Sequence, residues 1–256
     1  MSAVTAGVRI SFREAYSNRV GFWSQIVVMS VNDAAWILFW RLLFHRVGLI
    51  KGWDADRVTL LWAVGTAAIG LSSGVFGNLR RMGTLIANGS LDPLLTLPAR
   101  PLSLFLVRRV NPLGLGDAVF GLLLFLSMCH PTPTRFMVYV LVVVAGAVVF
   151  TSFLVILSSL TFFMGGNGDH VALGFDLTTI VSMYPLDLYG GLMRLAVFTV
   201  IPVAFMTAIP TSLIDNFSYV QAGLLAAAAT GAAVMARVVF DLGLRRYRSG
   251  SLWVRL

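Results

Sequence analysis

Residues 136–164 read FMVYVLVVVAGAVVFTSFLVILSSLTFFM and contain no charged side chain. A helix needs about 20 mostly apolar residues to cross the hydrocarbon core of a bilayer, and this stretch exceeds that length. The composition of the whole chain agrees: 58% of residues are hydrophobic, only 12% are charged, and mean hydropathy is +0.86. Soluble domains carry about 25% charged residues. We therefore expect an all-α protein that crosses a membrane several times.

Other apolar runs extend this pattern along the chain. We expect four further spans, at about residues 21–44, 58–77, 112–129 and 222–244. The stretch between Val171 and Ile214 is less regular and leaves two alternatives. Either 192–209 is a full span after an interfacial segment, or 171–184 is the span and the proline-broken stretch 185–214 is re-entrant. Both alternatives predict about six spans in a single domain, residues 1–256, because no polar linker divides the chain.

The N-terminal residues have a different pattern. Val8, Phe12, Ala15 and Tyr16 share one face of a helix over residues 7–19, which is typical of a helix lying in the membrane interface. A disordered tail is the alternative. The first long apolar run begins only after residue 20, too late for a cleavable signal peptide.

The distribution of basic residues predicts the orientation. Cytoplasmic loops of membrane proteins are enriched in Lys and Arg. With a cytoplasmic N-terminus, twelve basic residues lie inside and six outside, which places both termini in the cytoplasm. The twelve are Arg9, Arg13, Arg19, Arg80, Arg81, Arg100, Arg108, Arg109, Arg245, Arg246, Arg248 and Arg255. Because these arginines lie in short connections, they suit lipid phosphates better than nucleic acid.

Several kinds of chemistry are excluded by composition. The only lysine, Lys51, lacks the glycine frame of a phosphate-binding loop, so the chain has no ATPase motif. His45, His130 and His170 fall in three different connections and form no helical metal site. The single Cys129 is expected to pack in the core. We predict no enzyme, no metal and no cofactor held by this chain itself.

Polar residues inside the first span indicate a candidate translocation path. Asp33 lies near mid-span, where burying an aspartate in lipid costs about 2.5–3.5 kcal/mol. It should therefore face protein or water, either along a path for substrate or in a bond between helices. Its neighbours Asn32, Trp36, Phe39 and Trp40 complete the predicted path and suit a hydrophobic or amphiphilic molecule. Aromatic residues on a membrane helix also serve packing, which is the alternative.

Three further features concern the other spans. Arg237 and Asp241, four residues apart, are expected to form an ion pair. Asp117 is expected in the cytoplasmic interface near the start of its span. Gly70 and Gly74 form a pair of small residues that allows close helix packing, either within the chain or between two copies.

Residues 83–98, GTLIANGSLDPLLTLP, resemble the cytoplasmic segment between spans two and three of type-2 ABC exporter permeases. They are most similar to the viologen-exporter-like bacterial branch. A second similarity lies in the sequences YPL (184–186), LMR (192–194) and IPV (201–203), which look like the fifth span and re-entrant helices of that family. The shared positions of the first segment are Gly89, Leu91, Asp92, Leu94, Leu95 and Pro98.

The resemblance implies the membrane subunit of an ATP-driven exporter, of the kind involved in multidrug efflux, in the bacterial inner membrane. A separate ABC ATPase would bind the ATP and Mg²⁺. A second permease would complete the transporter, as a heterodimer or, alternatively, a homodimer. Residues 80–98 would form a coupling segment that contacts the ATPase, the alternative being an interfacial loop without a partner. The coupling residues would be Gly89, Ser90, Leu91, Asp92, Leu94 and Leu95, with Ser90 capping a helix and Leu94 and Leu95 as anchors.

The same resemblance places an outer gate in the broken stretch, at Tyr184, Pro185, Arg194 and Pro202. A competing function is a secondary transporter driven by an ion gradient, with Asp33 as the intramembrane carrier. Such transporters often contain internal repeats, and none is evident here. A lipid-modifying enzyme would need clustered His, Asp and Glu at one interface, which the sequence lacks. A scaffold without transport activity is a further alternative.

Overall fold

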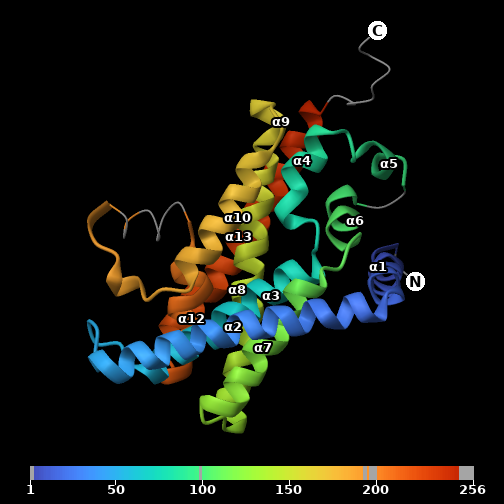
Figure 1. The fold of residues 1–256 in the computed structure, drawn as a ribbon. Helices are drawn as coiled ribbons and strands as arrows, with labels where there is room; N and C mark the ends of the chain where they lie inside the picture. The colour runs from blue at the N-terminus through green and yellow to red at the C-terminus, as the bar shows by residue number, and fades with distance from the viewer. Residues whose placement is uncertain (1–2, 98–99, 193–194, 196–200, 248–256) are drawn as a thin grey trace.

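The protein is almost entirely helical in the computed structural model, which describes residues 3–97, 100–192, 195 and 201–247 (Figure 1). The described elements are α1 (Ala3–Ser17), α2 (Arg19–Val47), α3 (Ala55–Val75), η1 (Leu79–Arg81), α4 (Met82–Ala87), α5 (Asp92–Leu95), α6 (Pro101–Val107), α7 (Pro112–Met128), α8 (Pro133–Ser159), α9 (Thr161–Met164), α10 (Asp169–Ser182), η2 (Leu186–Leu188), η3 (Ala204–Ala208), α12 (Ile209–Asp215) and α13 (Tyr219–Arg246).

Four helical segments are long and apolar enough to cross a membrane: α2, α3, the continuous pair α8 and α9, and α13. A fifth is added if α6 and α7, which are bent by 77° relative to each other, form one broken span. The all-helical fold is confirmed, but the described residues give four to five spans instead of about six. The helix α10 has only 14 residues, and η3 and α12 have five and seven. The described part of the stretch 185–214 is therefore too short for a full span.

Helix starts are set by polar caps and prolines. Asn111 accepts a hydrogen bond from the Leu113 N–H at 3.2 Å, and Pro112 begins α7. Thr132 and Pro133 start α8 in the same way. Proline suits this position because its missing N–H needs no partner in the first turn. The predicted spans consequently begin within a few residues of the observed helices.

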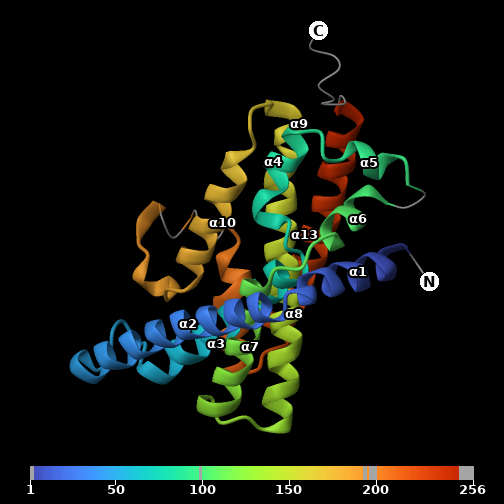
Figure 2. The ribbon, with the colours of Figure 1, turned by 45° about the vertical axis from the view of Figure 1, so that its right-hand side comes forward.

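The helix α3 is the centre of the fold. Of its most apolar stretch, 89% is buried, compared with 22% in α2 and in α13. It packs on α7, α8 and α2, and the ribbon shows α2 crossing in front of α7 and α8 (Figures 1 and 2). The small side chains of α3 make this central position possible, since bulky residues would hold its neighbours apart.

Glycines bring α3 and α7 into direct contact. A Cβ at Gly70 would lie 2.3 Å from the Ala118 backbone nitrogen, and one at Gly74 would lie 2.7 Å from the Leu115 nitrogen. Gly121 on α7 approaches α3 equally closely. The small-residue pair therefore serves packing within the chain.

We expect Gly70→Ala to destabilise the protein by about 1–3 kcal/mol, the usual cost of overpacking. The added methyl group meets backbone atoms of α7, which move less easily than a side chain. Gly231→Ala on α13 is the matched control, because no described atom lies within 4 Å of its added Cβ. Thermal unfolding of both purified variants measures the difference. Equal melting temperatures would contradict the assigned α3–α7 packing.

The N-terminal helix α1 begins earlier than predicted and packs on α6. The Ser11 hydroxyl donates a hydrogen bond of 2.6 Å to the Val107 carbonyl oxygen, and both groups are buried. Its Phe12 and Tyr16 rings contact Phe22 at the start of α2. The N-terminus is thus a helix held against the bundle, and the alternative of a disordered tail is wrong for the described residues.

Two smaller predictions are confirmed. Arg237 Nε lies 3.4 Å from Asp241 Oδ2 on α13, which forms the expected ion pair. Cys129 is buried at the end of α7 as a free thiol.

Candidate translocation site

Two adjoining cavities lie between α2 and the helices behind it. The inner cavity, of about 320 Å³, is formed by α2, α3, α7 and α10. The outer groove, of about 650 Å³, is lined by α2 together with Tyr184, which follows α10. Asn32, Trp36 and Tyr184 line both, so the cavities are continuous at these residues. All five residues of the predicted path line one or both cavities.

Aromatic rings form much of the wall. Trp36 stacks on Trp62 with ring centroids 6.0 Å apart, and this pair joins α2 to α3. Trp40 meets Tyr184 edge-on at 5.6 Å, which joins α2 to the end of α10. Phe39 is 49% exposed in the outer groove. Such a wall provides a large apolar surface with a few polar edges, the usual composition of small-molecule sites.

Two carboxyl groups line the inner cavity. Asp33 comes from α2 and Asp117 from α7, and these two helices pack closely on each other. The close approach depends on Gly116, where a Cβ would lie 3.0 Å from the Ile26 carbonyl oxygen of α2. Asn32 Nδ2 also donates a long hydrogen bond of 3.4 Å to Asp33 Oδ1. The expectation that Asp117 lies in the cytoplasmic interface stays a prediction; the structure adds that α7 packs on α2, so that Asp117 lines the same cavity as Asp33.

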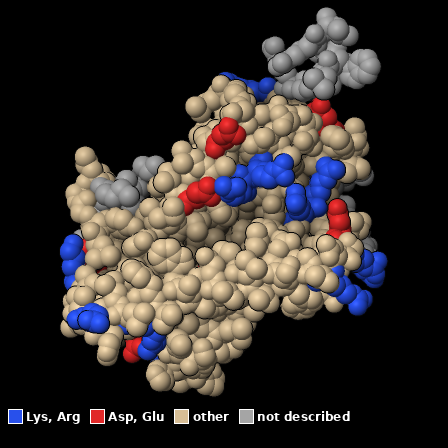
Figure 3. Space-filling view, viewed as in Figure 1, with Lys and Arg blue, Asp and Glu red and all other residues tan. Residues whose placement is uncertain are grey.

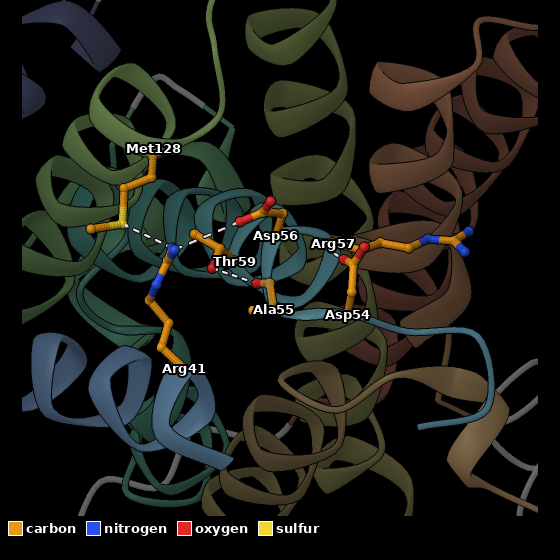
Figure 4. A network of polar contacts seen from close by, with 7 residues as sticks. All are labelled: Arg41, Asp54, Ala55, Asp56, Arg57, Thr59 and Met128. Carbon is orange, nitrogen blue, oxygen red and sulfur yellow. Dashed lines mark hydrogen bonds and ion pairs between the residues drawn. The ribbon is translucent and has the colours of Figure 1, made fainter. Parts of the chain in front are cut away.

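At the end of the bundle where α2 terminates, polar contacts join three helices (Figure 4). Arg41 of α2 lies 3.8 Å from Asp56 Oδ1 of α3 and donates to the Met128 sulfur of α7 at 3.7 Å. Asp54 caps α3 by accepting a hydrogen bond of 2.8 Å from the Arg57 N–H. These contacts fix the end of α2 relative to α3 and α7.

The residues of the predicted outer gate are only partly described. Tyr184 forms part of the cavity wall, and Pro185 is buried directly after it. Pro202 lies just before η3, while Arg194 falls outside the described residues. The neighbouring turn is held by Trp53, whose Nε1 donates to Asp187 Oδ2 at 2.9 Å. The gate role stays a prediction.

The predicted coupling segment, residues 80–98, is folded as η1, α4, a turn and α5; Pro98 lies outside the described residues. Gly89 makes the turn with φ of +74°. The predicted Ser90 cap is wrong: the Ser90 N–H donates to the Leu85 carbonyl at the end of α4, and Leu91 occupies the cap position of α5. Leu91 and Leu94 are buried, whereas Leu95 is 44% exposed.

Three contacts connect this segment to the rest of the chain. Arg80 makes a bidentate pair with Asp176 of α10, with Nε–Oδ1 at 3.0 Å and Nη2–Oδ2 at 2.8 Å. Tyr247, after α13, donates a hydrogen bond of 2.7 Å to Asp92 Oδ1. Gly83 lies against the turn before α10, where a Cβ on it would be 2.6 Å from the Gly168 carbonyl oxygen.

Charged side chains on the face of Figure 3 lie in separate groups, with a broad uncharged surface between them. The pair of Arg80 and Asp176 is half-exposed. Hydrogen bonding to Asp176 raises the pKa of Arg80 above its ordinary value. The guanidinium therefore remains charged throughout the physiological pH range.

The sequence assigned no site role to eight of the residues that line the inner cavity, among them Trp62 and Thr66 of α3 and Asp117 of α7. Gly70 and Gly74 were the available signal, because close packing of α3 on another helix places the α3 side chains beside that helix. No group of three His, Cys, Asp or Glu that could bind a metal occurs in the part of the chain that the structure describes.

Comparison with known protein families assigns the chain to one of them. A family model described as an ABC-2 family transporter protein matches residues 30–251, a range that includes all the cavity-lining residues except Met29, the segment 80–98 and α13. Comparisons with curated proteins and with solved structures give no match. Because the family match covers most of the sequence, this chain belongs to the ABC-2 transporter family, as a multi-pass membrane subunit that is not itself catalytic.

Proposed function

We propose that the protein is the permease of an ATP-driven exporter that moves a hydrophobic or amphiphilic compound out of the cell. The observation that supports this most directly is the folded segment 80–98. It is bonded to α10 and to Tyr247 directly after α13, and its Leu95 and Leu97 are 44% and 48% exposed. Two exposed leucines on a short folded connection suit a docking site for a partner subunit.

A physical route connects this segment to the cavity. Arg80 holds Asp176 on α10, and Thr179 and Ile180, one turn further along the same helix, line the inner cavity. A movement of the segment would shift α10 and thereby alter the cavity wall. ATP binding in a partner could then favour one of two cavity conformations.

The remaining parts of the proposal are supported by the family assignment and by the distribution of basic residues along the sequence. ATP and Mg²⁺ would bind to a separate ABC ATPase. A second permease would complete the cavity, as a heterodimer with a homodimer as the alternative. The bias of basic residues supports both termini in the cytoplasm of a bacterium, with the chain in the inner membrane. Tyr184, Pro185 and Pro202 would contribute to the outer gate.

The proposal is tested by purifying the tagged full-length chain from its native membrane in mild detergent. We expect a nucleotide-binding subunit to co-purify and its ATPase activity to depend on the permease. In inside-out vesicles, ATP should drive uptake, and a protonophore should leave that uptake intact. Uptake that requires a proton gradient and proceeds without ATP would instead support a secondary transporter with Asp33 as carrier.

A further inference from the structure

Three buried polar atoms of the inner cavity have no hydrogen-bond partner among the residues that the structure describes. They are Asp33 Oδ2, Asp117 Oδ1 and Trp62 Nε1. Asp33 is 4% exposed and Trp62 is 5% exposed, so neither is solvated at the protein surface. A buried polar atom without a partner costs about 1–3 kcal/mol, and atoms of this kind require an explanation. All three residues line the same cavity of about 320 Å³.

The two carboxyl groups give this cavity an acidic character. Both line it, Asp33 from α2 and Asp117 from α7. Within the described lining of the cavity there is no Arg, Lys or His that would offset their charge. Two adjacent carboxylates repel each other, and a positive group placed between them removes that repulsion.

The other walls suit an apolar body next to a positive group. The stacked rings of Trp36 and Trp62 form one wall of the cavity. The face of an aromatic ring attracts a cation that lies within about 6 Å of the ring centre. The cavity continues at Trp36 and Tyr184 into the outer groove of about 650 Å³. This groove can take a hydrophobic portion longer than the inner cavity holds.

We propose that the Asp33–Asp117 cavity binds a lipophilic protonated amine, whose N–H groups donate to the unpartnered carboxyl oxygens. The unpartnered oxygens need donors, and a quaternary ammonium ion carries the charge without an N–H to donate. The site therefore prefers a protonated primary, secondary or tertiary amine to a quaternary ion of the same shape. The Trp62 N–H offers a bond to an acceptor atom beside the amine. This inference rests on the proposed export function and names its substrate class.

The decisive experiment compares two probes by titration calorimetry. The full-length chain in lipid nanodiscs is titrated with N,N-dimethyl-1-naphthylmethylamine and with its N,N,N-trimethyl analogue, at about pH 7, where alkylamines are protonated. We expect the tertiary amine to bind at least about tenfold more tightly, since it alone forms a charge-assisted hydrogen bond. Equal affinities, or tighter binding of the quaternary ion, would overturn the proposal. This comparison uses the unmodified protein, so it does not depend on how variants fold.

Variants then locate the site. Asp33→Asn and Asp117→Asn should each weaken amine binding about tenfold or more. The matched control is Asp241→Asn, which removes a carboxylate from α13 at its ion pair with Arg237. It should leave binding unchanged. If both cavity variants bind the tertiary amine with wild-type affinity, the proposal is wrong, and Asp33 and Asp117 serve only the packing of α2 on α7.

Failure of the amine-binding proposal can be distinguished from failure of the export proposal. If the amine binds through Asp33 but no ATPase co-purifies, the site stands and the ATP-driven function fails. If the ATPase co-purifies and drives export while the two probes bind alike, the exporter stands and the amine proposal fails.

Discussion

Replacing Leu95 and Leu97 together by Asp should abolish ATPase stimulation and co-purification of the partner subunit, while the permease stays folded. Both side chains are about half exposed, whereas Leu91 and Leu94 beside them are buried. The leucines at positions 91–97 thus divide into two that stabilise the fold, Leu91 and Leu94, and two that are available to a partner, Leu95 and Leu97. Interface residues of large effect contribute about 2 kcal/mol or more each, so two changes should weaken binding about 1,000-fold.

The control for this experiment is Leu49→Asp. Leu49 is 68% exposed, but it lies in the connection between α2 and α3, at the opposite end of α3 from the segment 80–98. It should leave the ATPase bound and active. ATPase stimulation that survives the change of Leu95 and Leu97 would show that the partner docks elsewhere.

Leu94→Asp distinguishes the two kinds of leucine. The family resemblance implied that both Leu94 and Leu95 are anchors, but Leu94 is 6% exposed. A charge at this position has no described partner and should destabilise the segment by several kcal/mol. A lowered melting temperature in Leu94→Asp but not in Leu95→Asp would confirm the division.

The sequence predicted the long helices well because their signal is local. Residues 136–164 and 222–244 contain enough apolar residues to define a span without reference to the rest of the chain. The stretch after Tyr184 was ambiguous because Pro185, Pro202 and Pro210 interrupt it. Its described part consists of the short turn η2, a π-helical turn and a short helix, and irregular backbone of this kind is tolerated in a membrane only where protein or water surrounds it. Hydropathy does not report such contacts.

The site was predicted in part for a related reason. Asp33 was identified because a charge in mid-span is costly wherever the helix packs. Asp117 was expected in the cytoplasmic interface because it lies close to the start of its apolar run, and its place in the same cavity as Asp33 was not predicted. Its true neighbour depends on which helix α7 packs against and on the 77° bend before it. Such pairings are long-range, and a single sequence gives only indirect signs of them, here Gly116 and the glycines of α3.

Reversing the charge of Arg80 should uncouple ATP hydrolysis from transport. In Arg80→Asp, the bidentate contact with Asp176 is replaced by a repulsive pair of acids, so α10 no longer follows the segment 80–98. We expect ATP-driven export to fall about tenfold or more, within the usual range of coupling energies between sites. ATPase binding should persist, because Leu95 and Leu97 are unchanged. Since the Arg80 guanidinium stays charged, the wild-type contact should be equally effective from about pH 6 to pH 8.

The double reversal Arg80→Asp with Asp176→Arg tests the contact itself. The pair is half-exposed, so it contributes only about 0–1 kcal/mol to stability, and melting temperatures should hardly change in any of the three variants. Export, however, should fall in each single variant and recover toward the wild-type rate in the double variant. Recovery of export in the double variant would show that residues 80 and 176 act through their mutual contact. Two independent defects would instead add up in the double variant. A double variant as inactive as the single ones, with the ATPase still bound, would mean that motion reaches α10 by another contact, of which the backbone approach of Gly83 to Gly168 is the nearest.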